Sequence, residues 1–171
     1  MIHIVLVEPE IPQNTGNIAR TCAATGCRLH LVEPLGYSLS DRYLKRAGLD
    51  YWHLVDVQVH PCFADVRARL SDIPFFFMSV CGARSYDEIN YPEDAALIFG
   101  RESRGLPRDL LAANKEHCLR IPMIPEARSL NLSNSVAIVC YEALRQRGFP
   151  GMQGKGILAE AREEGAWTDY L

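Results

Sequence analysis

The sequence predicts an α/β fold, in which a mostly parallel sheet carries helices on both faces. Short apolar, β-branched runs alternate along the chain with helix-like segments, a pattern that favours parallel pairing of the strands. The chain has 171 residues, 48% of them hydrophobic, which suffices for one compact domain with its own core. We therefore expect a single domain over residues 1–151 and a tail over residues 152–171 that is not a separate domain.

The expected strands are short apolar runs that end at turn residues. The first, Ile2–Val7, is continuously apolar, as a strand covered on both faces should be. Phe75–Val80 and Ala96–Phe99 have the same character and are also expected to be buried. The remaining expected strands lie at residues 28–33, 54–59 and 118–121.

Besides a basic helix between Ser40 and Gly48, two helices are expected on the amino-terminal side of the apolar run at Phe75. The first covers residues 18–25, after a loop over residues 8–17 that is rich in turn residues, and Gly26 ends it. The second covers residues 63–70 and turns its apolar side chains inward.

A basic helix is expected between the strands at 28–33 and 54–59. Ser40 can cap it and Gly48 ends it. Its basic residues Arg42, Lys45 and Arg46 lie three and four positions apart, so they share one face. That face is either solvated or a stripe that contacts phosphates.

Two further helices are expected after the strand at Phe99. One begins at Pro107, a residue favoured in the first helical turn. The other begins at Ser135, after a proline-rich loop over residues 122–134, with Asn131 or Ser133 as its cap.

Charge and cysteine content limit the partners and the compartment. The formal net charge of -3 argues against binding nucleic acid by overall attraction, so an RNA site must be a local basic patch. The six cysteines form no CxxC pair and are expected to be buried, reduced thiols, as in the cytoplasm.

The histidines are dispersed without ligand spacing, so no metal site is expected. The chain opens directly on an apolar strand, and no leader or membrane segment is expected.

Three polar segments, Asn14–Arg20, Gly100–Gly105 and Ile121–Asn134, follow expected strands. The carboxyl ends of parallel strands meet at one edge of a sheet, where α/β folds bind their ligands. The Gly100–Gly105 loop lacks the middle glycine of a dinucleotide fingerprint and the Gly-Lys-Ser/Thr ending of a phosphate loop. Its chemistry therefore favours a nucleoside-like ligand, with Gly100 allowing the ligand to approach closely.

Together, the three segments resemble the signature motifs of the SPOUT methyltransferases, in the TrmH-like branch that modifies ribose 2′-hydroxyls of RNA. Asn14–Arg20 resembles the first motif, Phe99–Pro107 the second and Ile121–Ser133 the third. The resemblance covers about residues 1–150. Within the branch, residues 8–12, 46–51 and 145–151 of this chain are most similar to the TrmL group. That group methylates the wobble ribose, of cytidine or uridine, in certain tRNAs.

The resemblance implies a sheet whose C-terminal segment is tucked through a loop as a trefoil knot, and a homodimer. It also implies that S-adenosylmethionine is held in the knotted loops, largely by backbone groups. The positions that match the residues expected to line that pocket are Met78, Gly100, Ile121, Ser129 and Leu130. Glu102 is a candidate to shape or counter-charge the site, or alternatively to pair with Arg101 or Arg104.

The implied reaction moves a methyl group from the sulfonium to a ribose 2′-oxygen, and the residues mainly position the reactants. Arg20 matches the arginine of the first motif to which activation or orientation of the hydroxyl is assigned. Since an arginine side chain stays protonated in proteins, we expect Arg20 to bind the adjacent phosphate and polarise the 2′-oxygen. Asn14 and Asn131 are expected to orient groups nearby.

The expected partner is tRNA, with no membrane or DNA partner. An acidic protein must concentrate its positive charge to bind RNA. The candidates for RNA contact are Arg42, Lys45, Arg46, Arg101, Arg104, Arg108 and Arg128. The alternatives are 2′-O-methylation at another RNA site, a non-catalytic RNA-binding relative, and a nucleotide-dependent oxidoreductase that uses the Gly100 loop.

Overall fold

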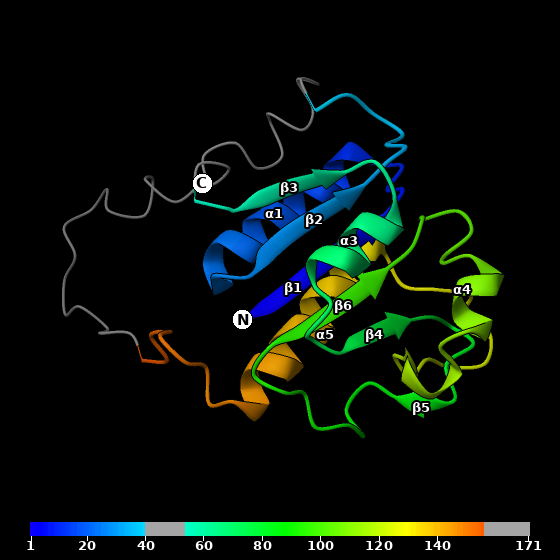
Figure 1. Ribbon diagram of the computed structural model, residues 1–171. Coiled ribbons are helices and arrows are strands. Elements are labelled where there is room, and N and C mark those ends of the chain that lie inside the picture. Colours follow the sequence, from blue (N-terminus) through cyan, green and yellow to red (C-terminus); the bar gives the residue numbers. More distant parts are fainter. Residues whose placement is uncertain (40–53, 156–171) are drawn as a thin grey trace, which may run out of the picture.

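A computed structural model describes residues 1–39 and 54–155 of the chain. Within these described residues, seven strands form one parallel sheet in the order β3-β2-β1-β6-β4-β7-β5. Helices cover both faces of this sheet (Figure 1). The α/β class expected from the sequence is therefore confirmed. In the described ranges, no helix is long and apolar enough to cross a membrane.

The strands are β1 (Ile2–Val7), β2 (Arg28–Val32), β3 (Val57–His60), β4 (Phe75–Met78), β5 (Arg84–Ser85), β6 (Ala95–Phe99) and β7 (Cys118–Arg120). Every residue of β1, β4 and β6 is buried, as their apolar composition predicts. β4 is shorter than expected, because it stops at Met78. β5 was not expected from the sequence, and its two residues form a strand only by pairing with β7.

The helices are α1 (Pro12–Thr25), α3 (Phe63–Arg69), α4 (Arg108–Ala112) and α5 (Leu132–Gln146), with a short 3-10 helix, η1, at Lys115–His117. α1 ends at Gly26 in the left-handed conformation, as expected. The expected basic helix from Ser40 to Gly48 lies outside the described residues.

Two helix starts differ from the sequence prediction. α1 begins at Pro12, so the expected start at residue 18 is wrong, because Asn14 and Thr15 are buried in its first turns by contacts with other parts of the chain. α5 begins before Ser135, and Asn131 is confirmed as its cap. The Asn131 side-chain oxygen accepts hydrogen bonds from the backbone nitrogens of Ser133 (2.9 Å) and Asn134 (3.3 Å).

The sheet separates two apolar cores. On one face, α1 and α5 pack over Ile4 and Leu6 of β1 and contact each other. On the other face, α3 and α4 pack over the alternate side chains, such as Val5 and Phe77. All six cysteines are free, and four are buried as expected, but the expectation is wrong for Cys62 and Cys81, which are exposed.

Three buried histidines lie side by side on adjacent strands, on the α3 face of the sheet. His3 Nδ1 lies 2.9 Å from His30 Nε2, and His30 Nδ1 lies 2.9 Å from His60 Nε2. Their sequence positions are far apart, and strand pairing brings them together. Burial lowers the pKa of all three imidazoles, that of His30 to about 3.

This histidine row predicts that the fold loses stability in mild acid. The unfolded chain takes up protons on these imidazoles below about pH 6.5, while burial in the folded state disfavours their protonation. The free energy of unfolding should therefore fall between pH 7 and pH 5, by about 2 kcal/mol for an imidazole, such as that of His30, which stays neutral in the folded state. Urea unfolding at several pH values measures this. A flat profile in the unsubstituted protein would contradict the prediction.

Candidate functional site

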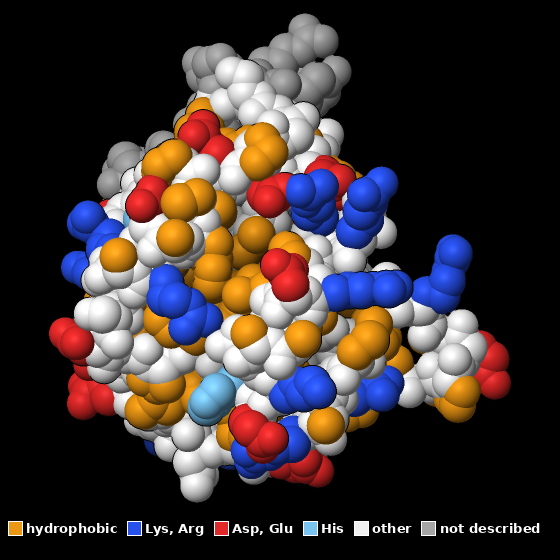
Figure 2. All heavy atoms as spheres, turned by 45° about the vertical axis from the view of Figure 1, so that its right-hand side comes forward, with side chains coloured by type: hydrophobic (Ala, Val, Ile, Leu, Met, Phe, Trp, Pro, Cys, Tyr) orange, Lys and Arg blue, Asp and Glu red, His pale blue; other side chains and the backbone are white. Residues whose placement is uncertain are grey.

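A large hollow lies at the carboxyl ends of the central strands. It is a cavity of about 770 Å³, within the size range of small-molecule sites. Residues that follow β4, β6 and β7 line it, together with the start of α1. Figure 2 shows apolar side chains in the hollowed centre of this face and basic side chains around them. A second cavity of about 260 Å³ lies at the amino ends of β4 and β7, beside Arg67 and His117.

The three polar segments singled out in the sequence meet at the large cavity. The Asn131 side-chain nitrogen donates to Asn14 Oδ1 at 3.0 Å, and the Asn14 side-chain nitrogen donates to Glu102 Oε1 at 2.9 Å. Each of these residues comes from a different segment, and all three line the cavity. Asn14 and Asn131 thus bind each other and hold the walls of the cavity together.

Glu102 binds the loop between β1 and α1. Its carboxylate accepts hydrogen bonds from the backbone nitrogens of Glu10 (2.8 Å) and Ile11 (3.2 Å), besides that from Asn14. Both oxygens are engaged in this way. Glu102 therefore shapes the site by fixing the first turn of α1.

The segment from Gly100 to Gly105 is a tight hairpin. The backbone nitrogen of Arg101 donates to the Gly105 oxygen at 3.2 Å, and the Gly105 nitrogen donates back to the Arg101 oxygen at 2.8 Å. A Cβ atom on Gly100 would lie 2.1 Å from the carbonyl carbon of Gly105 and 2.3 Å from the nitrogen of Leu106. The chain's own backbone therefore leaves no room for a side chain at this position, whereas the expected approach of a ligand to Gly100 stays a prediction.

The residues expected to hold the cofactor all line the one cavity: Met78, Gly100, Ile121, Ser129 and Leu130. Met123 lies among them. Sequence reasoning missed Val80 and Cys81, which also line the cavity and are exposed. Their position directly after the buried strand β4 is the signal that could have identified them.

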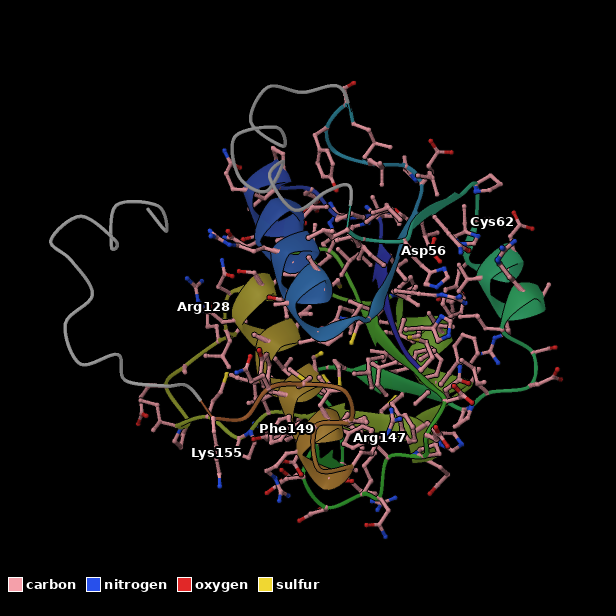
Figure 3. All side chains as sticks on the ribbon, turned by 90° about the vertical axis from the view of Figure 1, so that its left-hand side faces the viewer. Asp56, Cys62, Arg128, Arg147, Phe149 and Lys155 are labelled. Carbon is pink, nitrogen blue, oxygen red and sulfur yellow. The ribbon has the colours of Figure 1, made fainter. Side chains whose placement is uncertain are left out.

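The basic residues expected to contact RNA divide into two groups. The first group lines the cavity and consists of Arg101, Arg104, Arg108 and Arg128. Figure 3 shows Arg128 on the loop that precedes α5, at the opposite end of that helix from Arg147 and Phe149. Arg101 forms an ion pair with Glu8, whose backbone adopts a left-handed conformation with φ of 53°. The second group, Arg42, Lys45 and Arg46, lies outside the described residues. Arg20, which is expected to act on the 2′-hydroxyl, is exposed on α1 and does not line the cavity of its own chain.

The cavity offers few groups that could accept a proton. Among the described residues that line it, Glu102 is the one acidic side chain, and no histidine is present. The oxygens of Glu102 already accept three hydrogen bonds. The chemistry that this cavity supports is accordingly the positioning of an already activated reactant.

The sequence of residues 1–141 matches the SpoU rRNA Methylase family. The chain is 51% identical over 151 residues to a Bacillus subtilis protein named putative tRNA (cytidine(34)-2′-O)-methyltransferase, covering 86% of this chain and 94% of that protein.

Solved structures share the fold over nearly the same range. One, described as giving structural insights into the 2-OH methylation of C/U34 on tRNA, has a TM-score of 0.83 and 49% identity and covers 86% of this chain and 97% of its own. Another, an AdoMet-bound rRNA methyltransferase from Sinorhizobium meliloti, has a TM-score of 0.74 and 27% identity and covers 84% of this chain and 56% of its own.

Proposed function

The chain belongs to the SpoU rRNA methylase family, and we propose that it transfers a methyl group from S-adenosylmethionine to the ribose 2′-hydroxyl of the wobble nucleotide, cytidine or uridine 34, of tRNA. The observation that carries this proposal is the cavity in which the three motif segments meet. About half of the 151 aligned residues are identical to those of a relative named putative tRNA (cytidine(34)-2′-O)-methyltransferase. The family match also decides against the nucleotide-dependent oxidoreductase.

The cavity suits a nucleoside with a charged, flexible tail. Met78, Ile121, Met123 and Leu130 line it and provide apolar side chains for the adenine, and the Gly100–Gly105 hairpin adds backbone groups. Both carboxylate oxygens of Glu102 already accept hydrogen bonds within the protein. In this proposal, backbone carbonyl oxygens of the adjacent loops therefore stabilise the positive charge of the sulfonium. S-adenosylmethionine supplies an activated methyl group, so the protein contributes mainly by orienting the reactants.

The 2′-hydroxyl must lose its proton, and Glu102 is not a free base. Because an arginine side chain is a permanent cation in proteins and cannot act as a base, in our proposal Arg20 binds the neighbouring phosphate and polarises the 2′-oxygen. Asn14 and Asn131 act indirectly, because each holds a wall of the cavity in place. Arg101, Arg104 and Arg128 at the cavity rim, and Arg42, Lys45 and Arg46, would contact the RNA backbone.

The active protein in this proposal is a cytoplasmic homodimer. Arg20 lies outside the cavity of its own chain, so a second copy that sets its α1 at that cavity would complete the site. We also propose the trefoil knot of the family, with residues 1–151 as the catalytic domain and residues 152–171 as a tail.

Transfer of tritium from labelled S-adenosylmethionine to tRNA tests the function. Label is expected in bulk tRNA, and nucleoside mass spectrometry should place the methyl group on the ribose of nucleotide 34. A transcript with a 2′-deoxy nucleotide at that position alone is the matched control and should accept none. Label at another ribose would show a different RNA site, and the absence of transfer to any tRNA would show a non-catalytic relative.

A further inference from the structure

A contact between Glu10 and Ser103 joins the first loop of the chain to the tip of the Gly100–Gly105 hairpin. The Glu10 carboxylate accepts a hydrogen bond from the Ser103 backbone nitrogen at 2.9 Å and another from the Ser103 hydroxyl at 2.8 Å. One carboxylate therefore holds both donors of a single residue. The contact crosses 93 positions of sequence and is not part of any helix or strand pairing.

The backbone of Glu10 is itself fixed from two sides. Its nitrogen donates to Glu102 at 2.8 Å. On the other side, a Cβ atom on Gly36 would lie 2.7 Å from the Glu10 Cα, and the Gly36 nitrogen donates to the Pro9 oxygen at 2.9 Å. The Glu10 carboxylate is thus presented from a rigid support, so forming the contact with Ser103 costs little further entropy.

Glu10 and Glu102 make a reciprocal pair across this junction. Glu102 of the hairpin accepts from the backbone of Glu10, and Glu10 accepts from the backbone of Ser103, the next residue of the hairpin. The hydrogen bonds from Ser103 hold the pKa of the Glu10 carboxyl below its ordinary value, so it is an anion at neutral pH. The hairpin is therefore held at two successive residues by the β1–α1 loop.

The position of this contact favours a local role. Every residue from Gly100 to Gly105 lines the large cavity, so a shift of the hairpin changes the shape of the cavity wall. Ser103 is exposed and Glu10 is half-buried, and polar contacts of that kind add little to the stability of the whole fold. Losing the contact should loosen the hairpin and leave the protein folded.

We propose that Glu10 is a positioning residue for cofactor binding, which acts through Ser103 to hold the Gly100–Gly105 hairpin in the shape that receives S-adenosylmethionine. This inference rests on the proposed function. Glu10 itself does not line the cavity, and its influence passes entirely through the hairpin.

The test compares Glu10→Ala and Ser103→Ala with two conservative variants. In Glu10→Gln, the amide can accept from the Ser103 nitrogen and donate to its hydroxyl, and Ser103→Thr keeps the hydroxyl. Glu10→Ala should weaken S-adenosylmethionine binding, measured by titration calorimetry, by about three- to tenfold, the scale of lost hydrogen bonds. The methylation rate at saturating cofactor should stay within about twofold, and Glu10→Gln and Ser103→Thr should restore most of the affinity. Glu116→Ala removes an exposed carboxylate remote from the cavity and is the matched control for charge.

Amide hydrogen exchange without cofactor gives an independent readout. The Ser103 amide should exchange faster in Glu10→Ala than in the unsubstituted protein or Glu116→Ala, while amides of β1 and β6 keep their protection. Unchanged affinity in Glu10→Ala, in a protein that binds and uses S-adenosylmethionine normally, would overturn the positioning role and leave the proposed function intact. If the unsubstituted protein bound no S-adenosylmethionine, the proposed function would fail, and the positioning role with it.

Discussion

Replacing Gly100 by alanine is expected to abolish most of the methyl transfer, by about 100-fold, while the sheet remains folded. The new Cβ would lie 2.1 Å from the carbonyl carbon of Gly105, and backbone on both sides of the hairpin must move apart to admit it. A displacement of about 1 Å in a positioning wall can cost on the order of 100-fold in rate. Single-turnover methylation of tRNA, with circular dichroism to confirm folding, measures the effect.

Two other glycines provide matched controls for this substitution. Gly105→Ala adds a methyl group into open space but at a φ of 68°, so it should cost about 1–2 kcal/mol of backbone strain and a smaller loss of activity. Gly154→Ala meets no atom within 4 Å and should have no effect. Equal activity of the Gly100→Ala and Gly154→Ala proteins would show that the hairpin can accommodate a Cβ atom at position 100 without a functional change.

Replacing Arg20 by alanine should lower the single-turnover rate by about 100- to 1,000-fold at saturating tRNA and cofactor, the scale of one lost donor to a developing oxyanion. Arg20 is exposed on α1, away from both apolar cores, so the substituted protein should remain folded. Binding of S-adenosylmethionine should also persist, because Arg20 does not line the cavity of its own chain. Full single-turnover activity in Arg20→Ala would exclude a catalytic role.

If the protein forms the proposed homodimer, mixed dimers can tell whether Arg20 serves the cavity of the other copy. Arg20→Ala and Gly100→Ala chains are each expected to be inactive alone. The two chains can be co-expressed with different tags and purified as a mixed dimer. If each site is shared between the copies, the intact cavity of the Arg20→Ala chain then receives the intact Arg20 of the Gly100→Ala chain. Recovered activity supports a shared site, and an inactive mixed dimer would show that each chain uses its own Arg20.

The sequence predicts the buried strands well because their composition carries the information. Ile2–Val7 and Phe75–Met78 are covered on both faces, and nearly every side chain in them is apolar. The cavity was also foreseeable in outline, since polar segments that follow parallel strands must converge at one edge. Met78, Ile121 and Leu130 accordingly line the same cavity.

Features that depend on distant partners could not be predicted from local patterns. The first turns of α1 contain Asn14, Thr15 and Gly16, which favour turns in isolation, and the bonds of Asn14 to Glu102 and Asn131 help to keep that segment helical. The histidine row follows from the strand order of β1, β2 and β3, which no single strand encodes. The crowding at Gly100 likewise depends on how the hairpin closes on itself.

The hydrogen bond between Asn14 and Asn131 spans 117 positions of the chain, and it has a consequence for the timing of biosynthesis. At about 5–20 residues per second, a ribosome needs roughly 6–23 s to make the intervening segment. During that interval the first motif has been synthesised without its partner, and α5, which packs on α1 and β1, is still missing. A nascent chain or a truncated product therefore lacks a complete cavity, and the ability to capture cofactor and modify tRNA arises only in a nearly finished molecule.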